Sequence, residues 1–427
     1  MKSSRQVAAE ALARCERGGY SQLVLDAAIR RAGLLPRDAA FAGALFYGSL
    51  ERKLTLDHCI ARYARHPLTP EVQAILRCAV YQLLYLDSVP PRAAVDEAVD
   101  LVRTMRQSSA SGMVNGILRA FLRDGCAVPP TAGVLATLRV RYSCAEPLIA
   151  RLIDWYGEST AERVLASSIG RPPIFLRVNT LKTDAAALCA RLEAEGCRAA
   201  PGPFADCLTG TGDLAHTAAH ADGWFHIQDA ASQFAALTLD ARPGERVLDV
   251  CAAPGSKSFV AAQRMNNTGE LLACDLAPAR LQLVEKNAAR LGIRMLRTLE
   301  NDGAIDNPAL AAQPFDRVLC DVPCSGLGVL RRKPELKYRD AKTLDGLPPL
   351  QYKILETSSH YCRPGGTLVY STCTLNPDEN ERIIERFLAQ YPEFSPDPFD
   401  GERHFVTNLP GEGEADGFFI ARIRRRS

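Results

Sequence analysis

The feature that most constrains the fold is an alternation of short apolar runs with helical periodicity, which begins near residue 243. Apolar runs rich in β-branched residues predict strands, and apolar residues at intervals of three and four predict the helices between them. This alternation predicts a mostly parallel, doubly wound sheet that binds ligands at the carboxyl ends of its strands. The predicted strands are Arg246–Val250, Leu271–Asp275, Arg317–Asp321 and Thr367–Ser371, and the predicted helices are Ser258–Met265, Pro278–Leu291 and Leu350–Cys362.

The residues before this alternation predict two further domains. Residues 1–130 carry apolar stripes with helical spacing, separated by Gly and Pro turns, and predict a compact bundle of about six helices. A linker is expected at 125–133. Residues 141–235 mix a helix with short strands such as Pro173–Asn179, which predicts a small α+β domain. The α/β catalytic domain is then expected to span residues 236–427.

Composition excludes several classes of protein. With 427 residues, 47% hydrophobic and 23% charged, the chain has a globular composition and is too long for one ordinary core. No run of about 18 apolar residues predicts a membrane helix, and the N-terminal residues lack the apolar segment of a secretory signal. The 14 cysteines include no CxxC pair, so reduced thiols are expected without a disulfide framework or a zinc site.

Charge is unevenly distributed along the chain. Residues 1–140 contain 18 Lys and Arg against 12 Asp and Glu, a net of +6, whereas the remainder has a net of −4. This excess favours the N-terminal third as the surface that binds a polyanion. Ordinary solvated helices often carry a similar excess, so charge alone does not decide the point.

One strand–loop–helix junction has the character of a ligand-binding loop. Its sequence is Cys251-Ala252-Ala253-Pro254-Gly255-Ser256-Lys257, in which small residues let the backbone approach a ligand and N–H groups open a helix. Asp275 ends the next strand, where a carboxylate can accept hydrogen bonds from both hydroxyls of a ribose. Asp302 follows the third strand and is placed to accept from an adenine amino group. Each feature alone fits an ordinary turn or helix cap, but three successive strand ends favour a nucleoside cofactor.

Two of the cysteines follow strands at the same predicted edge of the sheet. Cys324 comes three residues after the strand that ends at Asp321, and Cys373 follows the next strand. The segment Asn376–Glu379 predicts a capped helix start with a capping box, and a helix N-terminus near Cys373 would favour its thiolate. A lone cysteine is usually buried filler, but this pair in this place indicates nucleophilic chemistry.

Such side chains suit methylation at carbon 5 of cytosine. That carbon is a weak nucleophile, whereas a thiolate that adds to C6 turns C5 into an enamine carbon able to attack a sulfonium methyl group. A carboxylate such as Asp321 would hydrogen-bond the N3/N4 edge of the base, and the second cysteine would assist elimination. The base must leave any stack to reach this site.

These motifs resemble the bacterial RsmB (Fmu/Sun) family of ribosomal RNA cytosine-C5 methyltransferases, and the likeness runs from the helical N-terminus to residues 416–422. The segment around Asn115–Arg119 is similar to the NusB-like RNA-binding domain of that family. The resemblance implies a Rossmann-like class I methyltransferase fold with S-adenosylmethionine as cofactor. By this resemblance, the cofactor site would contain Cys251, Ala252, Ala253, Pro254, Gly255, Ser256, Lys257, Asp275, Asp302 and Asp321, with Cys373 as the nucleophile and Cys324 helping to release the product.

The family usually has Gly where Ser256 stands, and a Ser fits there if its φ is below zero. The resemblance further implies a cytoplasmic monomer that acts on 16S ribosomal RNA of the small subunit. Transfer RNA methylation, a non-catalytic RNA-binding role in ribosome assembly, and DNA methylation remain alternatives. The NusB-like segment favours ribosomal RNA, and the cysteine pair with Lys257 favours catalysis. DNA cytosine methyltransferases attack with the Pro-Cys cysteine, so the second cysteine favours RNA.

Overall fold

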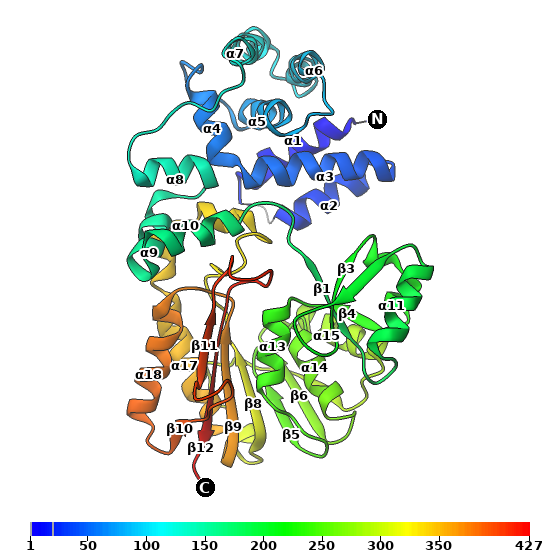
Figure 1. The fold of residues 1–427 in the computed structure, drawn as a ribbon, viewed down its shortest axis with the longest axis vertical. Helices are drawn as coiled ribbons and strands as arrows, with labels where there is room; N and C mark the ends of the chain where they lie inside the picture. Colours follow the sequence, from blue (N-terminus) through cyan, green and yellow to red (C-terminus); the bar gives the residue numbers. More distant parts are fainter. Residues whose placement is uncertain (1, 19–20) are drawn as a thin grey trace. The chain divides into compact units, whose positions relative to one another are not determined.

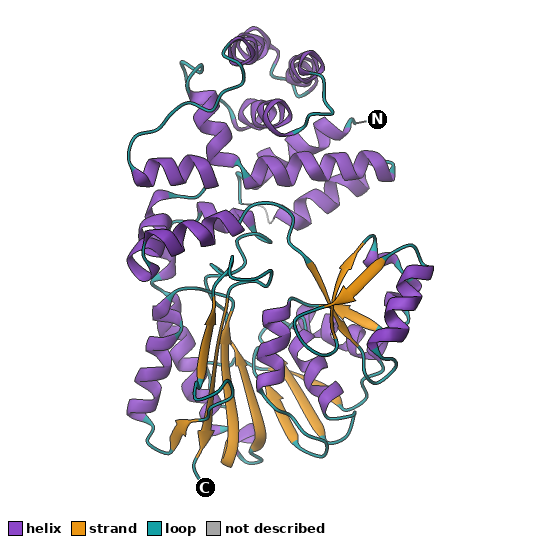
Figure 2. Ribbon diagram, viewed as in Figure 1, coloured by secondary structure: helices purple, strands orange, loops and turns teal. Residues whose placement is uncertain are grey.

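The computed structural model describes residues 2–18 and 21–427 and divides into two compact units (Figure 1). The first unit comprises Met1–Ile169 with Lys333–Asp340, and the second comprises Gly170–Arg332 with Ala341–Ser427. Helices dominate the first unit and both sheets belong to the second (Figure 2).

The first unit is a helical bundle built around α5 (Pro70–Tyr85), which contacts α1, α3, α4, α6 and α7. Prolines open α3, α5 and α6, where the missing N–H costs nothing, and Thr69 caps α5 by accepting the Val72 N–H at 3.3 Å. The predicted all-α bundle is confirmed. The other helices are α1 (Ser4–Cys15), α2 (Ser21–Ala32), α3 (Pro36–Glu51), α4 (Lys53–Ala61), α6 (Pro91–Thr104), η1 (Ser108–Ala110), α7 (Ser111–Arg123), α8 (Val134–Tyr142), α9 (Glu146–Tyr156) and α10 (Glu158–Ser167). Within the described residues, no helix is long and apolar enough to cross a membrane.

A short segment from the far end of the sequence completes this bundle. Lys333–Asp340, with the 3₁₀ helix η3 (Pro334–Tyr338), packs inside the first unit. The fully buried Lys337 donates through Nζ to the carbonyl oxygens of Glu51 at 2.8 Å and Tyr142 at 3.1 Å. Burial lowers the pKa of Lys337 to about 8. The first unit is therefore built from two separate stretches of chain, which no local sequence pattern predicts, and α8 to α10 belong to it although a new domain is expected from residue 141.

The second unit begins with a small antiparallel sheet in the order β2-β3-β1-β4. Leu188 and Leu192 of its helix α11 share a core with Leu176 and Phe225 of the sheet, and the Asp184 side chain caps this helix. The strand expected at Pro173–Asn179 and the helix that follows it are both present. The elements are β1 (Ile174–Val178), α11 (Ala185–Ala194), β2 (Arg198–Pro201), β3 (Cys207–Thr211), η2 (Leu214–His216), α12 (Ala218–Ala221) and β4 (Phe225–Ile227).

A larger sheet follows, in the order β10-β12-β9-β8-β5-β6-β7, with β11 paired to β12 (Figure 1). The strands from β9 to β7 are parallel, which confirms the predicted doubly wound sheet, while β10, β11 and β12 add an antiparallel edge that was not predicted. Helices α13, α14 and α15 pack in one core and α17 and α18 in another, so both faces of the sheet are covered. The elements are α13 (Ala230–Thr238), β5 (Arg246–Asp249), α14 (Ser256–Arg264), β6 (Glu270–Asp275), α15 (Pro278–Leu291), β7 (Leu296–Glu300), α16 (Pro308–Ala311), β8 (Phe315–Asp321), η4 (Ala341–Leu344), α17 (Leu347–His360), β9 (Cys362–Thr372), η5 (Pro377–Glu379), α18 (Glu381–Gln390), β10 (Phe394–Pro396), β11 (Phe405–Asn408) and β12 (Phe418–Arg425).

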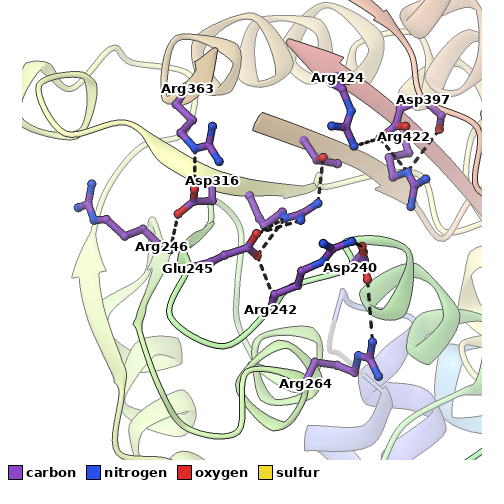
Figure 3. Close-up of polar contacts among 12 residues, drawn as sticks. Asp240, Arg242, Glu245, Arg246, Arg264, Asp316, Arg363, Asp397, Arg422 and Arg424 are labelled. Carbon is purple, nitrogen blue, oxygen red and sulfur yellow. Dashed lines mark hydrogen bonds and ion pairs between the residues drawn. The ribbon is translucent and has the colours of Figure 1, made fainter. Parts of the chain in front are cut away.

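An ion-pair network closes the amino edge of this sheet, away from the predicted site (Figure 3). Arg317, at the start of β8, donates to both carboxylate oxygens of Glu245 at 3.0 and 2.9 Å and to the Thr367 hydroxyl at 3.0 Å. Asp316 accepts the backbone N–H of Arg246 at 2.7 Å and the guanidinium of Arg363. The network joins the first residues of β5, β8 and β9, so it fixes their mutual register.

We expect Arg317→Ala to lower the free energy of unfolding by about 3 kcal/mol, because it leaves the mostly buried Glu245 carboxylate without its bidentate partner. Urea unfolding followed by circular dichroism measures this loss. Arg403→Ala is the matched control, since its ion pair with Asp400 is exposed and a change within about 0.5 kcal/mol is expected there. If Arg317→Ala lowered the free energy of unfolding no more than the small change expected for Arg403→Ala, the buried network would add nothing to stability.

Candidate active site

The loop from Cys251 to Lys257 connects β5 to α14 at the carboxyl edge of the sheet, as predicted. Gly255 has a φ of 102°, and a Cβ there would lie 2.5 Å from the Phe259 ring, so this position requires glycine. Ser256 is the first residue of α14 and its φ is not positive, so a serine fits at this position. The Ala252 N–H donates to the Cys274 carbonyl at 2.7 Å, which ties the loop to β6.

Asp275 at the end of β6 lies directly beside this loop. Its buried carboxylate accepts the N–H groups of Ala253 at 3.2 Å and Ala277 at 3.1 Å. The Arg280 guanidinium lies 3.2 Å from the same carboxylate and also donates to the Ala253 carbonyl. Arg280 was not predicted here, and it places a positive group between the strand end and the loop.

The turn after β7 brings Asn301 and Asp302 to the same edge. One Asp302 oxygen accepts the Ala304 N–H at 2.9 Å, as in an ordinary turn. Asn301 is buried, and its Nδ2 has no hydrogen-bond partner. A Cβ built on Gly303 would lie 3.8 Å from the Cys251 Sγ, so this turn meets the first loop. An unpartnered buried amide donor beside two carboxylates fits a ligand with acceptor atoms and hydroxyls, such as a nucleoside.

Lys257 and Asp321 form a buried ion pair, with Nζ 2.6 Å from Oδ2. The second oxygen of Asp321 accepts the Ser371 hydroxyl at 2.7 Å. Burial lowers the pKa of Lys257, but the charge of Asp321 and the hydrogen bond to it, with smaller contributions from Cys373 and Asp249, raise it more strongly, so the net shift is upward. The ammonium group therefore stays charged, and Cys373 lies within its field.

Cys324 and Cys373 are brought together as predicted, with their sulfur atoms 3.2 Å apart. The hydrogen bond to Cys373 and burial raise the pKa of the Cys324 thiol well above its ordinary value. Cys324 therefore retains its proton and can donate it to the other sulfur. The Gly328 N–H donates to the Cys373 carbonyl at 2.9 Å and fixes the backbone at that residue.

The expected helix start after Cys373 is only partly correct. Asn376 accepts the Asp378 N–H at 3.1 Å, but it caps η5, a three-residue 3₁₀ turn, and α18 begins only at Glu381. Glu379 is not a capping-box partner, because the backbone N–H of Asn376 donates to the Thr374 hydroxyl instead. A helix dipole is thus a poor source of thiolate stabilisation. The positively charged group that interacts electrostatically with Cys373 is Lys257.

Asp249 was missed by the sequence analysis although it lies in this cluster. It ends β5 as Asp275 ends β6. The strand-end rule used for Asp275, which selects polar residues at the carboxyl ends of parallel strands, would therefore have selected Asp249 too. Its carboxylate is fully buried, one oxygen accepts the Ser258 hydroxyl at 2.5 Å, and the other has no partner. Burial raises the pKa of Asp249 to about 7.

Relatives of known family match nearly the whole chain. The Bacillus subtilis (strain 168) protein named "Probable ribosomal RNA small subunit methyltransferase B" is 34% identical over an alignment of 449 residues, which covers 99% of both chains. The chain belongs to the ribosomal RNA small subunit methyltransferase B family. The Synechocystis protein of the same name is 36% identical over 96% of each chain. Membership makes the chain an RNA methyltransferase, and it confirms the resemblance found in the sequence.

Three family descriptions match successive parts of this family member. Residues 236–424 match "16S rRNA methyltransferase RsmB/F", residues 2–123 match the NusB family, and residues 146–209 match a ferredoxin-like domain of RsmF/B-like methyltransferases. A crystal structure of a methyltransferase homolog protein from Pyrococcus horikoshii matches with a TM-score of 0.61 and 29% identity, covering 69% of this chain and 100% of that one. Every predicted site residue lies within residues 236–424.

Proposed function

We propose that this RNA methyltransferase transfers a methyl group from S-adenosylmethionine to carbon 5 of a cytosine in 16S ribosomal RNA, through a covalent bond between Cys373 and C6. The observation that carries the proposal is the pair of sulfur atoms 3.2 Å apart, with the Lys257–Asp321 ion pair beside Cys373. A methyl transfer that needs no covalent adduct has no use for two cysteines at one strand edge.

The loop Cys251–Lys257, Asp275 and Asp302 would hold the cofactor, with the buried Asn301 amide as a further donor. When bound, S-adenosylmethionine supplies an electrophilic methyl group. Asp275 would bind the ribose hydroxyls and Asp302 the adenine amino group. The backbone N–H groups at the start of α14 would face the polar groups of the bound cofactor.

The residues of the chain account for the remaining steps. The Cys373 thiolate, favoured by the Lys257 ammonium, adds to C6 of the base. Asp321 would orient the base through its N3/N4 edge, since it is held by Lys257 on one side and Ser371 on the other. After methylation the C5 proton passes to solvent water acting as the base, and the C5–H electron pair expels the Cys373 sulfur from C6 as a thiolate, which restores the aromatic ring. The protonated Cys324 thiol would donate its hydrogen bond to that departing sulfur. Cys324 would assist this elimination.

One experiment tests the substrate and the product together. The purified chain is incubated with methyl-labelled cofactor and separately with 16S ribosomal RNA, transfer RNA and duplex DNA, and the labelled nucleosides are identified by mass spectrometry. We expect 5-methylcytidine from 16S ribosomal RNA alone. Label in transfer RNA or DNA instead would establish one of the alternatives, and label at another atom would refute the cytosine-C5 assignment.

We also propose that the first unit binds RNA through phosphate contacts. Arg119 and Arg123 are exposed on one face of α7, four residues apart. Replacing both with Gln should weaken RNA binding and reduce the salt dependence by about 0.7–0.9 per lost phosphate contact, because fewer counterions are released. Fluorescence anisotropy over a KCl series measures this slope. The double variant of Arg294 and Arg297, exposed in the second unit, removes the same charge as a control, and an equal effect there would contradict a specific role for α7.

A further inference from the structure

Glu379 is a buried carboxylate that the mechanism above does not use. It lies at the end of η5 and is fully buried, yet no Lys or Arg forms an ion pair with it within residues 2–18 and 21–427. Its oxygens accept three N–H donors instead, from Ser325, Gln351 and Asn376, at 2.9, 2.8 and 3.0 Å. Because all three partners are N–H donors, both oxygens of the Glu379 carboxylate act as hydrogen-bond acceptors.

Two of these donors lead directly to the second cysteine. The Ser325 N–H follows Cys324 in the chain, and Gln351 Nε2 also donates to the carbonyl of Pro323 at 2.9 Å. The residues on both sides of Cys324 are therefore held by Glu379, one directly and one through the fully buried Gln351.

The same network reaches the residue that follows Cys373. The Ser325 and Thr374 hydroxyl oxygens lie 2.5 Å apart, and the Asn376 N–H donates to the Thr374 hydroxyl. The titratable groups that bear on the Cys324 thiol are Cys373 just after β9, Glu379 on η5 and Asp321 at the end of β8, and the buried Tyr370 of β9 also faces it. Cys373, Glu379 and Asp321 all raise the pKa of Cys324, and the Glu379 charge is the one that belongs to no other part of the proposed mechanism.

We propose that Glu379 is a positioning residue for the second cysteine, because it holds the Pro323–Ser325 turn, and with it Cys324, against Cys373. Its negative charge adds to the hydrogen bond with Cys373 and to burial, which already favour the protonated Cys324 thiol. The two cysteines thereby acquire different roles, since only Cys373 is left to attack. This inference rests on the proposed function for its catalytic consequence, but the state of the Cys324 thiol is independent of any substrate.

The first test needs no RNA. Iodoacetamide alkylation of Cys324 is measured as a function of pH by mass spectrometry, in a Cys373→Ser background. We expect Glu379→Gln to move the onset of alkylation down by about one pH unit or more, and Glu379→Asp, which keeps the charge, to restore most of the original profile. Glu381→Gln is the matched control, because Glu381 accepts from Thr407 and is not among the charges that shift the pKa of Cys324. An unchanged profile in Glu379→Gln would overturn the proposal.

The second test uses the Cys373-containing chain with RNA and cofactor. Glu379→Gln should lower kcat about 100-fold without changing KM for the cofactor, and should accumulate the same covalent protein–RNA complex as Cys324→Ala. Because Glu379 acts through Cys324, adding Glu379→Gln to Cys324→Ala should cause no further loss. A further loss of similar size would assign Glu379 a purely structural role. If Glu379→Gln fails to fold, Gln351→Leu takes its place in this test. It removes the link to Pro323 but keeps the Glu379 charge, and it should also accumulate the covalent protein–RNA complex. Failure of wild-type methylation would refute the proposed function and leave the alkylation result standing.

Discussion

We expect Cys373→Ser to reduce methylation by a factor on the order of 10⁴ or more and to form no covalent complex with RNA. The reason is that the reaction requires a nucleophile at C6, and a serine hydroxyl is a far weaker acid than a thiol and does not supply one. Cys324 cannot replace it, because burial and the negative charges of Glu379 and Asp321 still favour its protonated thiol when Cys373 is gone.

The Cys324→Ala variant should behave in the opposite way. Attack and methyl transfer still take place at Cys373, but elimination stalls, so a covalent protein–RNA complex accumulates. Denaturing gels with labelled RNA and cofactor resolve the two outcomes. Cys320→Ala serves as the control, since this buried thiol lies four residues before Cys324 and faces Ser358 rather than the other cysteine.

Two results would contradict this division of roles. A complex trapped by Cys373→Ser and absent with Cys324→Ala would mean that the Pro-Cys cysteine attacks, as in DNA cytosine methyltransferases. Activity retained in both variants, with no complex from either, would remove the covalent mechanism altogether.

The parallel part of the large sheet was predictable because its signals are local. Three of the four predicted strands are present within two residues of their predicted bounds, and the helix Pro278–Leu291 has the predicted bounds. The fourth strand, β9, begins five residues early, at Cys362, where the end of a helix was wrongly predicted. A strand buried on both faces must be apolar throughout, so its pattern is visible in a single short run. The strand-end rule then identified Asp275, Asp321 and both cysteines, because the ends of parallel strands meet at one edge.

What the sequence did not reveal depends on partners far away in the chain. Lys337 is a charged residue in a turn-rich segment, and only the carbonyl groups at the ends of α3 and α8 explain its burial. Glu379 shows the same limit on a smaller scale. An acidic residue three positions after a capping Asn fits a capping box and a buried carboxylate equally well, and Asn380, with φ −121° and ψ −106°, ends the turn before a helix can form. The donors that distinguish the two readings come from Ser325 and Gln351.

The second large effect is expected at Asp275. We expect Asp275→Ala to weaken the binding of S-adenosylmethionine by about 100-fold to 10⁴-fold, because two ribose hydroxyls lose a charged acceptor and each such hydrogen bond contributes roughly 1.5–3 kcal/mol. The buried carboxylate is already aligned by the N–H groups of Ala253 and Ala277, so little order must be created on binding. Isothermal titration calorimetry without RNA measures this affinity separately from catalysis.

Glu300→Ala is the matched control for this measurement. Glu300 ends the neighbouring strand β7 in register with Asp275 but is exposed, so its removal should leave the cofactor affinity unchanged. Asp275→Asn separates charge from shape, because it keeps one acceptor oxygen and should fall between the wild type and Asp275→Ala. Asp275 also ties the Cys251–Lys257 loop to β6 through the Ala253 N–H, so its removal can affect folding. Thermal melting therefore checks that each variant is folded. Unchanged affinity in a folded Asp275→Ala protein would show that the ribose does not bind at this strand end. The proposed orientation of the cofactor above the sheet would then be wrong as well.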